Sequence, residues 1–250
     1  MNHKLGLTWN VRSDTLVRLA AFRAFKRSLV ANQTIEPTQV AGFNQFFDDL
    51  LGTDSKRYGI AVDHNLSVNL FSGLELSKRT LDIPIFGSGT TLTRTENQEE
   101  RTYRAYLYWV PHSTVAVGTE YHFEAFERES GAAVVLIRPL ELVTRRLPIT
   151  LNYFSPGGFF ARFAATPFRQ DIEQQITTGG TTKDSDSFWI ADLALGYRFP
   201  KRHGLVSLEI KNLFDKEFKF NDLDFQSGLP RTPLVQPDRL VLIRLALSWN

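Results

Sequence analysis

The sequence contains no cysteine, a single methionine and no long apolar run. The missing cysteines exclude disulfides and thiolate metal sites. No run approaches the roughly 18 apolar residues that a membrane helix needs. The net charge of +2 is close to neutral and gives no indication of a nucleic-acid partner. Met1 leads directly into an alternating pattern, without the apolar segment of a secretory signal.

What the sequence does contain is apolar residues in strict alternation. Successive side chains of a strand point to opposite faces, so alternation predicts strands with one apolar face. Two of these predicted strands, at 188–199 and 239–250, have apolar faces with an aromatic residue at one or both ends, as is typical of a bilayer interface. We expect these residues to face lipid: Trp189, Leu193, Tyr197, Val241, Ile243, Leu245, Leu247 and Trp249.

The alternating runs predict about 11 strands, and the connections between them alternate between short and long. The predicted long connections are 29–56, 82–100, 128–144 and 170–186. The apolar segment 40–51 is compatible with a short helix, and 132–143 with a folded loop or a strand extension. Strict sorting of connections by length is typical of an antiparallel up-and-down transmembrane β-barrel, whose short turns and long loops lie on opposite sides of the membrane.

One motif near the C-terminus is more specific. The run Ile210-Lys-Asn-Leu-Phe-Asp-Lys-Glu-Phe218 is followed by a loop and a final strand that carries Trp249. This order resembles the C-terminal end of TonB-dependent outer-membrane receptors. The resemblance rests on Asn212, Leu213, Phe214, Asp215, Lys216 and Phe218. It implies a barrel of about 22 strands, of which this chain would form half.

Strand parity leads to the same expectation. The first connection is short, so the first strand begins on the side of the long loops and the last strand ends on the opposite side. A closed bacterial barrel has an even number of strands and both termini in the periplasm. We therefore expect residues 1–250 to be the C-terminal part of a barrel domain, without the plug or other N-terminal domain. We expect the remaining strands to belong to an N-terminal half of the barrel or to a second chain.

The polar faces of the strands are expected to line the lumen. The candidates are Asp63, Glu75, Glu120, Glu124, Arg162, Asp192, Glu209, Lys211 and Arg244. Their mixed signs favour pairing with one another and with a plug over selection of one ion. His122 lies between two of these glutamates and is a candidate cation ligand, although a polar lumen wall is the simpler interpretation. Phe43, Phe46 and Phe47 either contact a ligand or, as we favour, pack a loop onto the barrel.

No catalytic or cofactor motif accompanies this pattern. The sequence has no nucleophile elbow, phosphate-binding loop or zinc signature, so we expect neither an enzyme nor a bound cofactor. The resemblance implies a location in the bacterial outer membrane and uptake of a scarce nutrient such as a siderophore, cobalamin or a glycan. Its partners would be outer-membrane lipid, the barrel-assembly machinery and a TonB-type energy coupler.

Two alternatives remain open at this point. The first is a barrel coupled to a periplasmic helical-repeat domain, which would act in export or surface assembly. The second is a soluble β-sandwich that serves as a binding module. The aromatic ends of the apolar strand faces argue against the sandwich.

Overall fold

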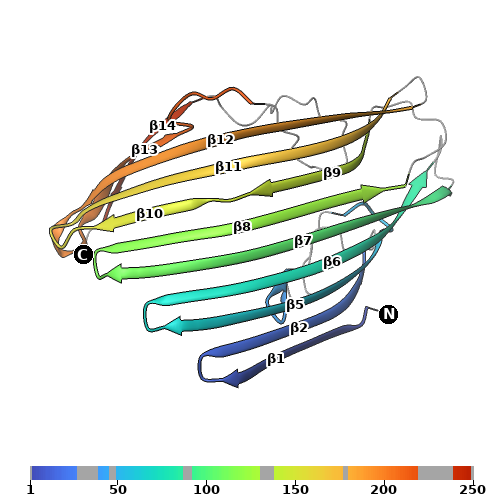
Figure 1. The fold of residues 1–250 in the computed structure, drawn as a ribbon, viewed down its shortest axis with the longest axis horizontal. Coiled ribbons are helices and arrows are strands. Elements are labelled where there is room, and N and C mark those ends of the chain that lie inside the picture. The colour runs from blue at the N-terminus through green and yellow to red at the C-terminus, as the bar shows by residue number, and fades with distance from the viewer. Residues whose placement is uncertain are drawn as a thin grey trace.

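The chain forms one large antiparallel sheet that is wound strand by strand (Figure 1). The computed structural model describes residues 2–26, 39–44, 49–86, 92–129, 138–176, 180–218 and 239–248. None of the described residues belongs to a helix with the length and apolar character to span a membrane. The strands are β1 (Lys4–Arg12), β2 (Thr15–Phe25), β3 (Gln39–Val40), β4 (Phe43–Asn44), β5 (Asp54–Ser67), β6 (Leu70–Phe86), β7 (Leu92–His112), β8 (Val115–Arg128), β9 (Arg138–Arg146), β10 (Ile149–Phe154), β11 (Phe159–Ile176), β12 (Gly180–Arg198), β13 (Gly204–Lys211) and β14 (Leu240–Leu247).

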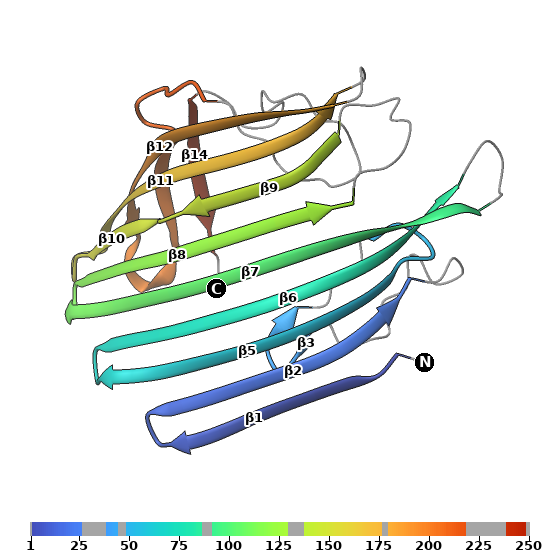
Figure 2. The ribbon, with the colours of Figure 1, turned by 45° about the vertical axis from the view of Figure 1, so that its right-hand side comes forward.

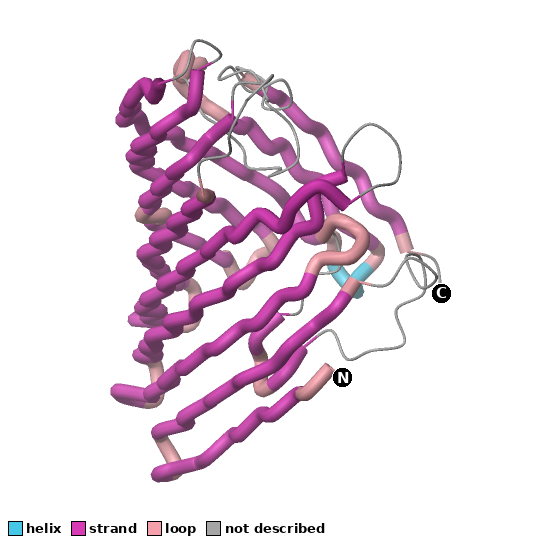
Figure 3. The backbone as a smooth tube through the Cα atoms, turned by 90° about the vertical axis from the view of Figure 1, so that its right-hand side faces the viewer, coloured by secondary structure: helices cyan, strands magenta, loops and turns pink. Residues whose placement is uncertain are grey.

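The strand order confirms the predicted up-and-down arrangement. It runs β1-β2-β5-β6-β7-β8-β10-β11-β12-β13-β14, which gives eleven places across the sheet. β9 and β10 share one place, because both pair with β8 on one side and β11 on the other. Figures 2 and 3 show the sheet bent into an open trough. Among the described residues only the small β3–β4 hairpin forms another sheet, so the sandwich alternative is wrong.

The two faces of the sheet keep their identity from strand to strand. We call the face that carries the β3–β4 hairpin the inner face, and its opposite the outer face. Continuous register places Leu7, Leu19 and Ile60 next to one another on the outer face. One residue along each strand, the inner face carries Gly6, Ala20 and Gly59. A one-residue slip would exchange the two faces, so the alternation in the sequence fixes the register.

The two edges of the sheet also differ. Short turns join the strands at 13–14, 68–69 and 113–114, and we call this the turn edge. At the opposite edge, the loop edge, two predicted long connections prove to be mostly strand and a third is strand in part. β6 and β7 pair as far as Phe86 and Leu92, and β11 and β12 as far as Ile176 and Gly180. β9 occupies much of the third, which confirms the strand extension considered for 132–143 from residue 138 onward.

The short helix over 40–51 is wrong for the residues that the structure describes. Residues 39–44 form the β3–β4 hairpin instead. Ala41 and Gly42 have φ of 49° and 84°, the left-handed conformations of a tight hairpin turn. Residues 45–48 lie outside the described residues.

The outer face is apolar and open to its surroundings. Exposed fractions reach 51% for Trp189, 61% for Leu245 and 79% for Ile243. Single exposed apolar residues are ordinary in soluble proteins, but a contiguous apolar face of this kind marks contact with lipid or another protein. The register places seven of the eight predicted lipid-facing residues on this face, namely Trp189, Leu193, Tyr197, Val241, Ile243, Leu245 and Leu247. The eighth, Trp249, lies outside the described residues.

Candidate functional site

The β3–β4 hairpin folds inward and packs on the inner face. Phe43 is 1% exposed, and its ring covers Gly59 so closely that a Cβ at this glycine would lie 2.4 Å from the ring. Val40, Ala20 and Ala61 complete the buried contact. The packing role that we favoured for Phe43 is therefore confirmed. The other two phenylalanines considered with it, at 46 and 47, lie outside the described residues.

Two arginines of the large sheet, on β2 and β5, form hydrogen bonds with the backbone of the hairpin. Arg18 Nη1 donates a hydrogen bond to the carbonyl oxygen of Ala41 at 3.3 Å. Arg57 Nη1 donates to the carbonyl oxygen of Asn44 at 2.9 Å. The guanidinium of Arg18 also lies 5.5 Å from the centre of the Phe43 ring, within the range of a cation–π contact. The hairpin is thus attached by polar contacts at its turn and at the end of β4, as well as by its apolar core.

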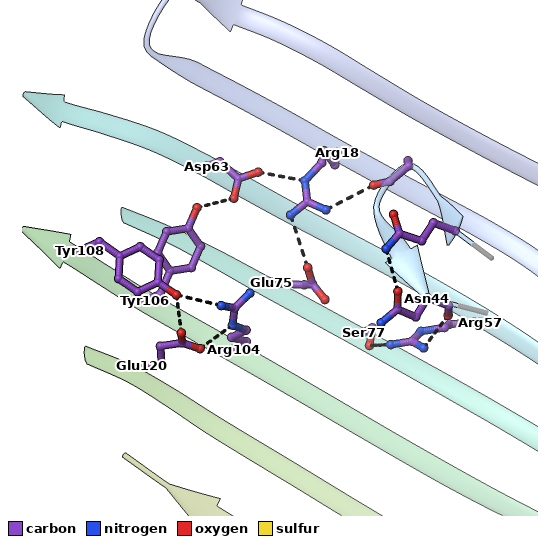
Figure 4. Close-up of polar contacts among 12 residues, drawn as sticks. Arg18, Asn44, Arg57, Asp63, Glu75, Ser77, Arg104, Tyr106, Tyr108 and Glu120 are labelled. Atoms are coloured by element: carbon purple, nitrogen blue, oxygen red, sulfur yellow. Dashed lines mark hydrogen bonds and ion pairs between the residues drawn. The ribbon is translucent and has the colours of Figure 1, made fainter. Parts of the chain in front are cut away.

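Arg18 is also the centre of a polar network on β2, β5, β6 and β7 (Figure 4). Its Nε donates to Asp63 Oδ2 at 2.9 Å, and its Nη2 donates to Glu75 Oε2 at 3.4 Å. The hydroxyl of Tyr106 donates to the second oxygen of Asp63 at 2.7 Å. These side chains are only partly exposed, which strengthens charge-assisted hydrogen bonds relative to the same bonds in bulk water.

A second group adjoins the first along β7 and β8. Arg104 Nε donates to Glu120 Oε2 at 2.9 Å, and its Nη2 donates to the hydroxyl oxygen of Tyr108 at 3.0 Å. Tyr108 itself donates to Glu120. The rings of Tyr106 and Tyr108 stack at 4.9 Å and so join the two groups. We call Arg18, Asp63, Glu75, Arg104, Tyr106, Tyr108 and Glu120 the inner network.

The candidate cation site at His122 is not assembled. His122 Nε2 lies 2.9 Å from Glu120 Oε2, whereas Glu124 accepts a hydrogen bond from Arg146 at 3.1 Å. Across the described part of the chain, no group of three or more histidine or acidic side chains has the arrangement of a metal site. The carboxylates here serve ion pairs and hydrogen bonds within the wall.

Closer to the loop edge lie two buried arginines, one of which ties the connection that follows the hairpin to the large sheet. Arg57 and Arg79 are both 7% exposed. Arg79 pairs with Glu100 of the neighbouring strand at 3.2 Å and with Asp49 of the connection that follows the hairpin. Arg57 Nη2 donates to Ser77 at 2.9 Å. An unpaired buried charge is costly, so these contacts oppose release of the connection.

A separate polar pocket of about 260 Å³ lies on the inner face of β10 to β13. Lys211 Nζ and Asp192 Oδ2 lie 2.9 Å apart on its wall. The guanidinium of Arg198 lies 5.6 Å from the ring centres of both Phe154 and Phe160. The pocket therefore combines aromatic surface with charges of both signs. Four of the predicted lumen-facing residues line it, namely Arg162, Asp192, Glu209 and Lys211.

Asn212, the first residue of the C-terminal motif, ends β13 and turns the chain. It adopts a φ of 49°, a left-handed conformation that asparagine tolerates better than most residues. Its Nδ2 donates to the carbonyl oxygen of Lys216 at 3.0 Å, and its Oδ1 accepts from the Lys216 backbone N–H at 2.9 Å. The Asn212 backbone N–H donates to Asp192 at 3.0 Å. The asparagine thus replaces the ladder hydrogen bonds lost where the strand stops.

The aromatic residues of the motif lie against β12. Phe218 stacks on Phe188 with ring centres 4.4 Å apart. Phe214 is 60% exposed and meets Trp189 with ring centres 5.3 Å apart. Leu213 donates its backbone N–H to the carbonyl oxygen of Ala191 at 2.7 Å. In this structure the motif therefore has a structural role: it ends β13 and packs the residues that follow against β12.

The nine predicted lumen-facing residues all fall on the inner face by register. That this face lines a lumen stays a prediction. Only one pair among the nine, Lys211 with Asp192, bonds within the set. The arginines and tyrosines that hold the other carboxylates were missed, although strand parity alone would have placed Arg18 with Ala20 and Arg104 with Tyr106 on one face.

The protein-family model described as TonB dependent receptor-like, beta-barrel, matches residues 2–213, which span the sheet from β1 through β13. No curated protein matches the chain.

Proposed function

Because the chain belongs to the TonB-dependent receptor-like β-barrel family, we propose that it serves an outer-membrane receptor for a scarce nutrient such as a siderophore, cobalamin or a glycan. The family is one of outer-membrane receptors and transporters, generally without enzymatic activity. The observation that carries the proposal is the match over residues 2–213, which coincides with an unbroken up-and-down sheet.

The chain is proposed to be the C-terminal part of the barrel wall. Among the described strands, β1 and β14 each have a neighbour on one side only, and they stand at opposite ends of the strand order. An open sheet edge presents unpaired backbone groups, which a lipid environment does not satisfy. Further strands, from an N-terminal half or from a second chain, would complete the wall.

The inner face is proposed to line the lumen, and the outer face to contact lipid. The inner network supports this assignment, since its charged side chains lie at mid-strand, where contact with hydrocarbon would be costly. The inward β3–β4 hairpin narrows the space that a nutrient or a plug would occupy. A plug domain, a TonB-type energy coupler and the barrel-assembly machinery are the partners that this assignment implies.

Growth under nutrient limitation tests the proposal. The gene would be deleted and the strain grown with a siderophore, cobalamin or a glycan as the limiting source, with the complete reading frame returned on a plasmid as the control. We expect a growth defect on one of these sources, and the same defect in a strain that lacks the energy coupler. Normal growth on every source, together with loss of a surface component, would instead favour export or surface assembly.

A further inference from the structure

The polar pocket on the inner face of β10 to β13 has a floor of small residues. The register places Ala194 of β12 between Arg162 on β11 and Glu209 on β13. At the next inner-face position of β12, Gly196 lies so close to the ring of Phe160 that a Cβ there would be 2.3 Å from it. Because residues 194 and 196 project almost no side chain, a volume of about 260 Å³ stays open between the charged groups.

The pocket contains one charged pair and three charged side chains without an ionic partner. Lys211 Nζ lies 2.9 Å from Asp192 Oδ2, so these two charges neutralise each other. Within the described ranges, Arg162, Arg198 and Glu209 form no ion pair and no side-chain hydrogen bond. The pocket therefore presents two positive charges and one negative charge to whatever occupies it.

Arg162 and Glu209 stand on opposite sides of the pocket floor. Each lies one strand away from Ala194, and neighbouring strands are about 4.8 Å apart, so the two Cα atoms are separated by roughly 10 Å. Lys211 and Asp192, by contrast, lie on adjacent strands and pair directly. The wider separation of the arginine and the glutamate leaves room for a ligand that carries both charges, because a charge-assisted hydrogen bond could form at each side.

Arg198 adds the second positive charge at the aromatic side of the pocket. Its guanidinium lies 5.6 Å from the ring centres of both Phe154 and Phe160. A ring face attracts a cation, but the guanidinium keeps its five N–H groups as hydrogen-bond donors for a carboxylate. The two rings thus hold Arg198 beside the pocket without neutralising it.

We propose that this pocket binds a free α-amino acid with an acidic side chain, such as glutamate. The α-carboxylate meets Arg162, the ammonium group meets Glu209, and the side chain runs along β12 so that its carboxylate meets Arg198. Two negative charges and one positive charge on the ligand match the three unpaired groups one for one. The volume lies just below the roughly 300–1,000 Å³ of pockets for drug-sized molecules, as a small ligand requires. The inference rests on the proposed exposure of the inner face to an aqueous lumen, and on no particular nutrient.

The test uses the protein expressed from its complete reading frame and purified in dodecyl maltoside. Equilibrium dialysis measures the binding of radiolabelled glutamate to the wild type and to the variants Arg162→Gln, Glu209→Gln and Arg198→Gln. Each variant loses one charged hydrogen-bond partner and should bind glutamate roughly ten- to a hundredfold more weakly. Arg244→Gln is the matched control, because it removes an inner-face arginine that does not line the pocket, and it should bind as the wild type does.

Two analogues, measured by competition, assign the individual contacts. Glutarate lacks the ammonium group, so Glu209→Gln should not weaken its binding. Glutamine lacks the side-chain carboxylate, so Arg198→Gln should leave its binding unchanged.

Three results would overturn the proposal: no binding of glutamate by the wild type, equal binding by the wild type and all three pocket variants, or binding of glutarate as tight as that of glutamate. The last result would show a plain anion site. Growth on the limiting nutrient is scored in separate cultures, so failure of this site and failure of the receptor function give different results.

Discussion

The two faces of this sheet handle charge in opposite ways. On the inner face, charged side chains occur at mid-strand and each carboxylate of the inner network meets an arginine or a tyrosine. On the outer face, mid-strand positions are apolar and charge begins only at the loop edge, as in Lys56 after Tyr58. Charge at mid-strand in this sheet thus depends on a partner supplied by a neighbouring strand.

The largest effect is expected from a charge placed at mid-strand on the outer face. Leu245 is 61% exposed there, and Leu245→Arg should cost about 2–4 kcal/mol of folding free energy in a lipid bilayer. Leu242 is the matched control, because it lies on the inner face of the same strand, opposite Glu209. Denaturant titration of protein folded into vesicles compares the two variants. A Leu242→Arg variant as unstable as Leu245→Arg would contradict the assignment of the faces.

A smaller effect is expected when an inner-face partner is removed. Asp63→Ala deprives Arg18 and Tyr106 of their common acceptor and should cost about 2 kcal/mol, as for other charge-assisted hydrogen bonds. Asp82→Ala provides the control, because Asp82 faces another carboxylate, that of Asp54, across the strands. We expect no loss of stability in the control. A double-mutant cycle with Arg18→Ala should show strong coupling to Asp63, and additive effects would refute the network.

The attachment of the β3–β4 hairpin can be weakened from the wall side. Gly59→Ala brings a methyl group against the Phe43 ring and should cost about 1–2 kcal/mol through overpacking. The hairpin at 39–44 should then become a site of proteolytic cleavage while the sheet remains intact. Gly157→Ala is the control, since its added carbon would lie 3.7 Å from Ser155 Oγ, an ordinary van der Waals distance. Equal protease resistance of both variants would show that the hairpin does not depend on this contact.

The smallest effect is expected for an exposed ion pair on the outer face. Lys183 and Glu173 lie 3.1 Å apart, but the lysine side chain is 76% exposed. Lys183→Gln should therefore change the unfolding free energy by less than about 0.5 kcal/mol. Repeating the measurement in about 1 M salt, which screens exposed charges, should remove even this difference. A loss of unfolding free energy as large as that expected for Asp63→Ala would contradict the expected difference between the two faces.

The sequence alone predicted the sheet where one face is apolar. In β12, Trp189, Leu193 and Tyr197 recur with the correct parity, and this periodicity is enough to place the strand and its faces. It was not enough at the loop edge of β7, where the residues on both faces of the strand are polar. Residues 93–100 of β7 show no alternation, yet Glu96 pairs with Ile83 and Gln98 with Leu81 across the ladder. Their strand conformation depends on pairing with the neighbouring strand, so it cannot be predicted from the residues close to them in sequence.

The inner network was predicted only in part, for a related reason. A single strand shows which face Asp63 or Glu120 occupies, but not which residue lies beside it on other strands. The partners Arg18 and Arg104 are 45 and 16 residues away in sequence. The prediction for the hairpin segment failed for a different reason. Ala41-Gly42 is a turn signal embedded in an apolar stretch that also fits a helix. Long-range register decides the first case and local turn geometry the second.

The break between β9 and β10 has a mechanical consequence. Pro148 lies in this break and Pro167 lies nearby on β11, and neither proline has an N–H to donate. Only the proline carbonyl oxygens take part in hydrogen bonds between the strands there. The carbonyl of Pro148 accepts from the Glu120 backbone N–H at 3.0 Å, and that of Pro167 accepts from the Leu147 backbone N–H at 3.1 Å. Because fewer ladder hydrogen bonds join the strands at this break, we expect the sheet around β9, β10 and β11 to deform most easily here. Opening motions, and with them amide hydrogen exchange, should therefore start at this seam and spread outward along the strands.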